Sequence, residues 1–147
     1  PASAAIAVNR TNGYRDIVVL HLSDIYLVAA EAALLADDPA TALTYINDVR
    51  SRAGVAEYTS AELSSRYQFR EAVRAERRLE LAFENQRWFD LLRWGVATTT
   101  VNEYINSEAF YSEYNYTVNP IADWQTMLPI PLSVININPD VAQNVGY

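Results

Sequence analysis

Three glutamates spaced four residues apart are the clearest candidates for chemistry in this sequence. Glu76, Glu80 and Glu84 fall on one face of an expected helix. Two carboxylates can cleave a glycosidic bond when one acts as the acid and the other as the base or nucleophile. Carboxylates one turn apart on a helix point the same way, however, and do not flank a substrate. We therefore interpret Glu76, Arg78, Glu80 and Glu84 as part of an ion-pair ladder that ties this helix to its neighbours.

A second block, RWFDLLRWG, is dense in arginine and aromatic residues. It could offer a stacking surface to a sugar or a base. We favour a structural corner in which Trp88 and Phe89 are buried and Asp90 pairs with Arg87 or Arg93. The apolar spacing within the block suits a buried helix face.

The best candidates for contact with a ligand or a partner are four aromatic residues further along the chain, Tyr111, Tyr114, Tyr116 and Trp124. Aromatic rings combine an apolar face with a polar tip, which suits sugars and protein surfaces alike. The alternative is an aromatic lid that covers a helical core. Both interpretations stay open from the sequence.

The composition excludes several kinds of chemistry. The chain has no cysteine and one histidine, His21, which we expect to lie in the core. Thiol nucleophiles, disulfides, zinc ribbons and multi-histidine metal sites are therefore absent, and we expect no metal and no cofactor. All 11 basic residues are arginine, which excludes a Schiff-base lysine. A net charge of −7 argues against nucleic acid as a partner. A carboxylate enzyme, a ligand-binding module and a helical interaction scaffold remain.

The elements that would position these residues are helices. Helical periodicity begins at Leu22 and breaks at Asp37; Asp38 and Pro39 then suit the start of a second helix, which ends before Gly54. The first helix should bury the stripe Leu22, Ile25, Tyr26, Ala29, Ala32, Ala33 and Ala36. The span of residues 20–53 has the 34-residue length of one tetratricopeptide unit, which predicts an antiparallel hairpin.

A third, longer helix is expected to follow. Thr59 and Glu62 form a possible capping box at its start, and the helix should run to about Glu84, with Asn85 ending it. Residues 98–119 are predicted to be a long aromatic-rich loop with short helical turns. The remainder should be an extended tail rich in proline and asparagine. The predicted fold class is therefore all-α, with no visible domain boundary.

Three blocks in fixed order resemble the SusD/RagB family of Bacteroidota outer-membrane lipoproteins. The first runs from Leu22 to Gly54 and includes LSDIYLVAAEA and INDVRSRAG. The second runs from Glu76 to Gly95 and includes ERRLELAFE and RWFDL. The third runs from Leu128 to Tyr147 and includes LPIP and QNVGY. The resemblance covers nearly the whole chain from residue 17, and the ordered set is highly specific.

The resemblance implies a helical scaffold with tetratricopeptide-like hairpins and no catalysis. It implies a cell-surface subunit that captures a nutrient, usually a glycan, for a SusC-like TonB-dependent β-barrel transporter in the outer membrane. Family members are several times longer and carry an acylated cysteine. Residues 1–147 would then be one C-terminal fragment of a SusD-like helical domain, attached to the membrane only through a lipid anchor outside this chain. Peptide importers share the scaffold, and a helical interaction scaffold without its own ligand site is the alternative; a carboxylate glycosidase is third.

Overall fold

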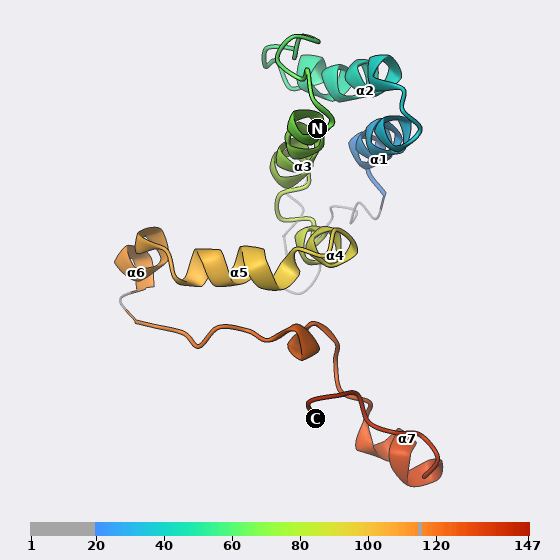
Figure 1. Ribbon diagram of the computed structural model, residues 1–147, viewed down its shortest axis with the longest axis vertical. Helices are drawn as coiled ribbons and strands as arrows, with labels where there is room; N and C mark the ends of the chain where they lie inside the picture. The colour runs from blue at the N-terminus through green and yellow to red at the C-terminus, as the bar shows by residue number, and fades with distance from the viewer. Residues whose placement is uncertain (1–19, 115) are drawn as a thin grey trace, which may run out of the picture. The chain divides into compact units, whose positions relative to one another are not determined.

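The computed structural model describes residues 20–114 and 116–147, and within them every regular element is a helix. Contacts divide the chain into two compact units, with the boundary between Leu81 and Ala82. The first unit contains α1 (Leu22–Leu35), α2 (Pro39–Arg52) and α3 (Arg66–Glu80). The second contains α4 (Arg87–Arg93), α5 (Ala97–Ile105), α6 (Glu108–Tyr114), the 3-10 helix η1 (Asp123–Thr126) and α7 (Leu132–Ile137) (Figure 1). The predicted all-α fold is confirmed.

The first unit is a three-helix core. A short turn joins α1 to α2 as the predicted hairpin, and α3 packs against α1. No helix in the described ranges is both long enough and apolar enough to cross a bilayer. The core consists of Leu27, Ala30, Leu34, Ala42, Ile46, Val49, Phe69, Ala72 and Val73.

The start and end of α2 follow local sequence signals. The Asp38 carboxylate accepts a hydrogen bond from the Thr41 backbone N–H at 3.1 Å, and Pro39 occupies the first helical position. Hydrogen bonding by Thr41, first from its side chain and then from this backbone N–H, lowers the pKa of Asp38. Gly54 has φ +72° just after the helix, where a left-handed residue completes a common C-terminal cap. Both ends of α2 are therefore as predicted.

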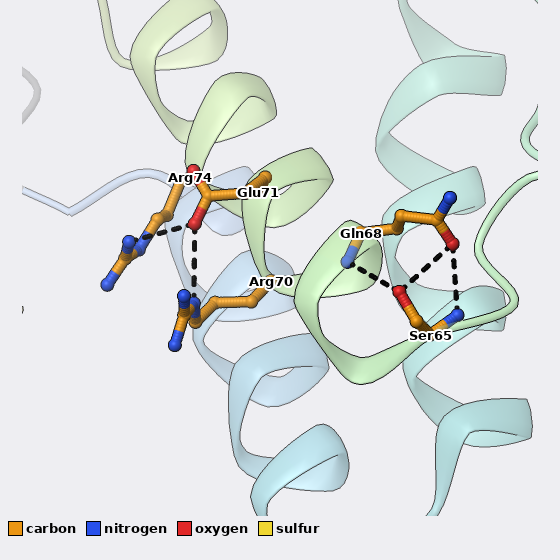
Figure 2. Close-up of polar contacts among 5 residues, drawn as sticks. All are labelled: Ser65, Gln68, Arg70, Glu71 and Arg74. Atoms are coloured by element: carbon orange, nitrogen blue, oxygen red, sulfur yellow. Dashed lines mark hydrogen bonds and ion pairs between the residues drawn. The ribbon is translucent and has the colours of Figure 1, made fainter.

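The predicted bounds of the third helix are wrong at both ends. α3 begins after Ser65, whose hydroxyl accepts from the Gln68 N–H at 3.2 Å while the Gln68 side chain accepts from the Ser65 N–H at 3.1 Å (Figure 2). Thr59 and Glu62 form the same kind of box, but it closes only a turn in the α2–α3 connection. The helix ends at Glu80 because the left-handed backbone of Phe83, φ 67°, is incompatible with its continuation.

The stripe of α1 that we expected to be buried is wrong in part: Tyr26 and Ala33 pack against the core, but other members of the stripe do not. The core side is formed by Ser23, Leu27, Ala30 and Leu34. Leu22 and Ile25, which belong to the predicted stripe, are 67% and 53% exposed. α1 is apolar on nearly every side, so periodicity alone did not decide which face meets α2 and α3.

The second unit contains more helix than expected. Most of the segment predicted as a long loop forms α5 and α6, and α7 interrupts the predicted extended tail. The threonine- and valine-rich start of α5 has weak intrinsic helix propensity, so its tertiary contacts decide its structure. Gly95, with φ +67°, makes the turn from α4 into α5.

Candidate functional site

Three tyrosine side chains gather around Phe110 at the junction of α5 and α6. The ring centroid of Phe110 lies 5.6 Å from that of Tyr104, 4.8 Å from Tyr114 and 5.7 Å from Tyr116. Phe110 is 7% exposed, whereas the three tyrosines are 44–55% exposed. We call these four residues the aromatic cluster. The Phe110 ring at the centre of the cluster is buried, and the three tyrosine rings around it are partly exposed to solvent.

Local capping and one long-range clamp position the aromatic cluster. The Ser107 hydroxyl accepts from the Phe110 N–H at 3.2 Å and donates to the Tyr104 carbonyl at 2.6 Å, which fixes the turn between the two helices. Asn102 on α5 holds the later chain through two hydrogen bonds with the backbone of Ile121, at 2.8 and 3.0 Å. The tyrosines therefore extend from a braced junction rather than from a free loop.

The chemistry of the aromatic cluster suits stacking and hydrogen bonding. A hydrogen bond to Glu113, reinforced by the negative charge of that carboxylate, raises the pKa of Tyr114. The Tyr114 hydroxyl thus stays protonated at neutral pH. Half-exposed rings with hydroxyl tips are the kind of surface that takes a sugar ring on its apolar face.

The charge around the aromatic cluster limits what it can bind. From residue 94 to residue 147 the sequence contains no basic residue, and its acidic residues are Glu103, Glu108, Glu113, Asp123 and Asp140. A phosphate, sulfate or carboxylate ligand would meet only like charges on this segment. Nowhere in the described chain do three or more metal-binding side chains gather into a possible ion site. The surface therefore favours a neutral ligand.

The four predicted contact residues do not form one site. Tyr114 and Tyr116 belong to the aromatic cluster. Tyr111 is 54% exposed on α6 and makes no ring contact in the described part of the chain. Trp124 lies instead against Tyr147, with ring centroids 5.0 Å apart. The predicted set also omitted Tyr104 and Phe110; the spacing of four between Phe110 and Tyr114 was the signal that pairs them.

Trp124 is part of a clasp that holds the C-terminal tail. The Tyr147 hydroxyl donates to the Met127 carbonyl at 2.9 Å. The Gln143 side chain makes two hydrogen bonds with the Ile130 backbone, at 2.7 and 2.9 Å. Gly146 has φ +101°, and a Cβ there would lie 2.4 Å from the Trp124 ring. Trp124 thus has a packing role in addition to any contact with a ligand.

We predict that Gly146→Ala opens this clasp. The added methyl group collides with the indole and the backbone conformation disfavours a side chain, so the tail must shift. Hydrogen exchange of the Ile130 amide, which donates to Gln143, should accelerate by about tenfold or more. Gly95→Ala is the matched control, because it has a positive φ but no atom within 4 Å of its added Cβ. Unchanged protection of Ile130 in Gly146→Ala would contradict the prediction.

Two glutamates of α3, Glu76 and Glu80, pair with arginines of α2. Glu76 is buried and pairs with Arg50 at 2.7 Å, and Glu80 pairs with Arg52. His21 Nδ1 lies 3.8 Å from Glu80, and the ring is 35% exposed, so the expectation of a core histidine is wrong. Neither glutamate is free to act as an acid or base on a substrate while it holds its arginine.

The two other predicted residues of the ladder, Arg78 and Glu84, lie outside its ion pairs. Arg78 is exposed, and the described chain gives it no ion-pair partner, so it is not part of the ladder. Glu84 is half-buried and lies beyond the end of α3. The ladder also has a member that the sequence did not reveal: Arg77, 4% exposed, pairs with Asp24 of α1 at 2.7 Å.

The corner at α4 is formed by ion pairing and not by burial of its large rings. Asp90 is buried and pairs with Arg93 at 2.9 Å. Arg87 lies 5.9 Å from the Trp94 ring centroid. Trp88 and Phe89 are 38% and 63% exposed, so the expectation that both are buried is wrong. The apolar side of this short helix is formed by other residues, with Leu91 buried.

Comparisons with known proteins agree with the resemblance. The model of the SusD family matches residues 3–147. The chain is 39% identical over 144 residues to a SusD-like protein of Formosa agariphila, covering 94% of this chain and 26% of that protein. It is 31% identical over 136 residues to the starch-binding protein SusD of Bacteroides thetaiotaomicron, covering 90% and 22%. A crystal structure of a SusD superfamily protein from Bacteroides vulgatus is 26% identical with a TM-score of 0.68, covering 85% and 26%. The chain thus spans about a quarter of the length of these relatives.

Proposed function

The chain belongs to the SusD family, and on that premise we propose that it is the C-terminal part of a non-enzymatic, cell-surface subunit of a nutrient importer. The subunit binds a glycan and delivers it to a SusC-like TonB-dependent β-barrel transporter in the outer membrane. Its lipid anchor lies outside this chain. One relative is called starch-binding, which supports a glycan as the nutrient.

The observation that carries the ligand part of the proposal is the half-exposed aromatic cluster on a segment without cations. Stacking rings and hydroxyl donors suit a sugar, and the absence of basic residues from 94 to 147 disfavours an anionic one. Tyr104, Tyr114 and Tyr116 are the proposed contacts. Tyr111 and Trp124 are secondary contacts at the edges of the same unit. A helical scaffold that only supports a ligand site elsewhere is the alternative.

Co-purification tests the importer part of the proposal. An antibody to this chain should recover the native parent from detergent-solubilised outer membrane together with a large β-barrel protein. The parent should be longer than 147 residues and acylated. A short parent that is free of any barrel would contradict the importer role and leave a stand-alone helical scaffold.

Matched neutral and charged sugars test the ligand class. In calorimetric titration we expect the purified protein to bind neutral maltoheptaose, or another neutral oligosaccharide of a glycan panel. Sulfation of the same oligosaccharide should weaken binding by about tenfold or more, and added salt should reduce the difference by screening the acidic residues. Equal or tighter binding of the sulfated form would contradict the neutral-ligand proposal.

A further inference from the structure

A pocket of about 400 Å³ lies in the first unit, where the end of α1, the start of α2 and the start of α3 come together. This volume is near the lower end of the range for small-molecule sites, which favours a small ligand. The pocket contains none of the tyrosines of the aromatic cluster, which belongs to the second unit. Its apolar lining includes Leu34, Pro39, Leu43, Leu63 and Phe69.

Two opposite charges line this pocket and do not neutralise each other. Asp37 and Arg66 are both part of its wall, and both are exposed. Neither has an ion-pair partner within residues 20–114 and 116–147. The guanidinium of Arg66 donates from Nη2 to the Leu35 carbonyl at 3.3 Å, which leaves most of its donors for another group. The wall therefore offers a carboxylate and a guanidinium to a ligand.

The fold needs the backbone conformation of Asp37 but not its charge. The residue has φ 63° just after α1, and its N–H donates to the Leu34 carbonyl at 3.3 Å. The next N–H, that of Asp38, donates to the Ala33 carbonyl at 2.9 Å. These two bonds form a common left-handed cap at a helix end, where glycine or asparagine is the usual residue. The carboxylate of Asp37 is thus available for a role outside the fold.

The hydroxyl groups of the lining are mostly engaged. The Ser64 hydroxyl donates to the Gln68 side chain at 3.1 Å, and the Ser65 hydroxyl is held by Gln68 in the capping box (Figure 2). The Ser60 hydroxyl has no hydrogen-bond partner among the residues that the structure describes. A ligand would therefore meet a carboxylate, a guanidinium and one hydroxyl, set in an apolar wall.

From these contacts we infer that the pocket binds a small zwitterion with an apolar body, of the class of an apolar α-amino acid. The ligand carboxylate pairs with Arg66, whose planar guanidinium can take it through two parallel hydrogen bonds. The ligand ammonium group pairs with Asp37, and the apolar side chain lies against Leu43 and Phe69. This site is separate from the proposed glycan surface and does not depend on it.

Three other kinds of ligand fit this pocket less well. A neutral sugar would place its hydroxyls against an apolar wall and leave both charges without a partner. A fatty acid has a carboxylate for Arg66, but that carboxylate would be repelled by Asp37. An apolar side chain of a partner protein would fill the pocket and use neither charge.

Blocked derivatives of one amino acid test the inference. L-phenylalanine carries both charges, its N-acetyl form only the carboxylate, and its amide only the ammonium group. In ligand-observed NMR titrations of the purified protein that carries this chain, we expect L-phenylalanine to bind tighter than either blocked form by about tenfold or more. The comparison isolates the two charges because all three probes share one side chain.

Substitutions in the wall of the pocket assign each charge to its partner. Asp37→Asn keeps the left-handed cap, so it should leave the urea unfolding midpoint unchanged while it weakens binding of L-phenylalanine by about tenfold or more. Binding of the N-acetyl form should not change in this variant, because that probe has no ammonium group. Arg66→Gln should weaken binding of L-phenylalanine to a similar degree. Asp48→Asn on α2 and Arg70→Gln on α3 are the matched controls, since both residues are exposed and lie outside the pocket.

Three results would overturn the inference. Equal binding of all three probes would leave an apolar pocket without a zwitterion site. Equal loss of binding in the two control variants would assign the effect to net charge. Failure of L-phenylalanine to bind, in a protein that binds a neutral oligosaccharide, would remove this site and keep the proposed function.

Discussion

Glu76→Gln is expected to lower the free energy of unfolding by about 3 kcal/mol, the lower end of the range for breaking a buried ion pair by removing one partner. The Glu76 side chain is 6% exposed and the Arg50 side chain 17%, so the guanidinium left behind cannot turn freely to water. Arg50 keeps a hydrogen bond to the Ala56 carbonyl at 2.7 Å and a position 4.0 Å above the Tyr58 ring. These contacts make the loss smaller than for a fully isolated charge.

Urea unfolding followed by circular dichroism measures this effect, and Arg78→Gln is its matched control. Both substitutions replace a charged residue of α3 by glutamine, but Arg78 is exposed and pairless within the described residues. Its removal should change the free energy of unfolding by less than about 0.5 kcal/mol. If Glu76→Gln instead kept full stability and abolished hydrolysis of a glycan, the carboxylate glycosidase hypothesis would replace the ladder.

Local signals in the sequence predict parts of this fold well and others poorly, for physical reasons. The bounds of α2 follow from Asp38, Pro39 and Gly54, which act on their own backbone. The start of α3 was misplaced because two capping boxes occur close together. The box at Ser65 is followed by the buried core residues Phe69, Ala72 and Val73, whereas the box at Thr59 is followed only by the partly buried Leu63. A capping box is thus sufficient for a turn and not for a helix.

The grouping of the predicted contact residues depends on how the chain folds. The sequence does not reveal which of its closely spaced tyrosines contact Phe110. These contacts depend on the turn at Ser107, which places α6 against α5. Trp124 belongs with Tyr147, 23 positions later, and no local pattern connects the two. The sequence predicted which kind of residue would form the site. Which of these rings contact one another depends on the fold.

The double substitution Tyr114→Ala with Tyr116→Ala is expected to weaken binding of a neutral oligosaccharide by about tenfold or more. Tenfold corresponds to about 1.4 kcal/mol, which is within the reach of two lost stacking contacts. The centroids of the two rings lie 6.0 Å apart at an interplanar angle of 63°, and both rings are about half-exposed, so one ligand can reach both. Tyr67→Ala, which removes an exposed tyrosine from α3, is the matched control and should leave binding unchanged.

The same variants separate a ligand surface from an aromatic lid. Both tyrosines also cover Phe110, so the alanine pair removes packing as well as stacking, and its stability must be measured alongside its affinity. Tyr114→Phe keeps the ring over Phe110 and removes only the hydroxyl and its bond to Glu113. A ligand that uses this hydroxyl should bind more weakly to Tyr114→Phe at unchanged stability. Loss of stability in the alanine pair with unchanged affinity would establish the lid, and loss of affinity in Tyr111→Ala alone would assign the ligand contact to Tyr111 instead.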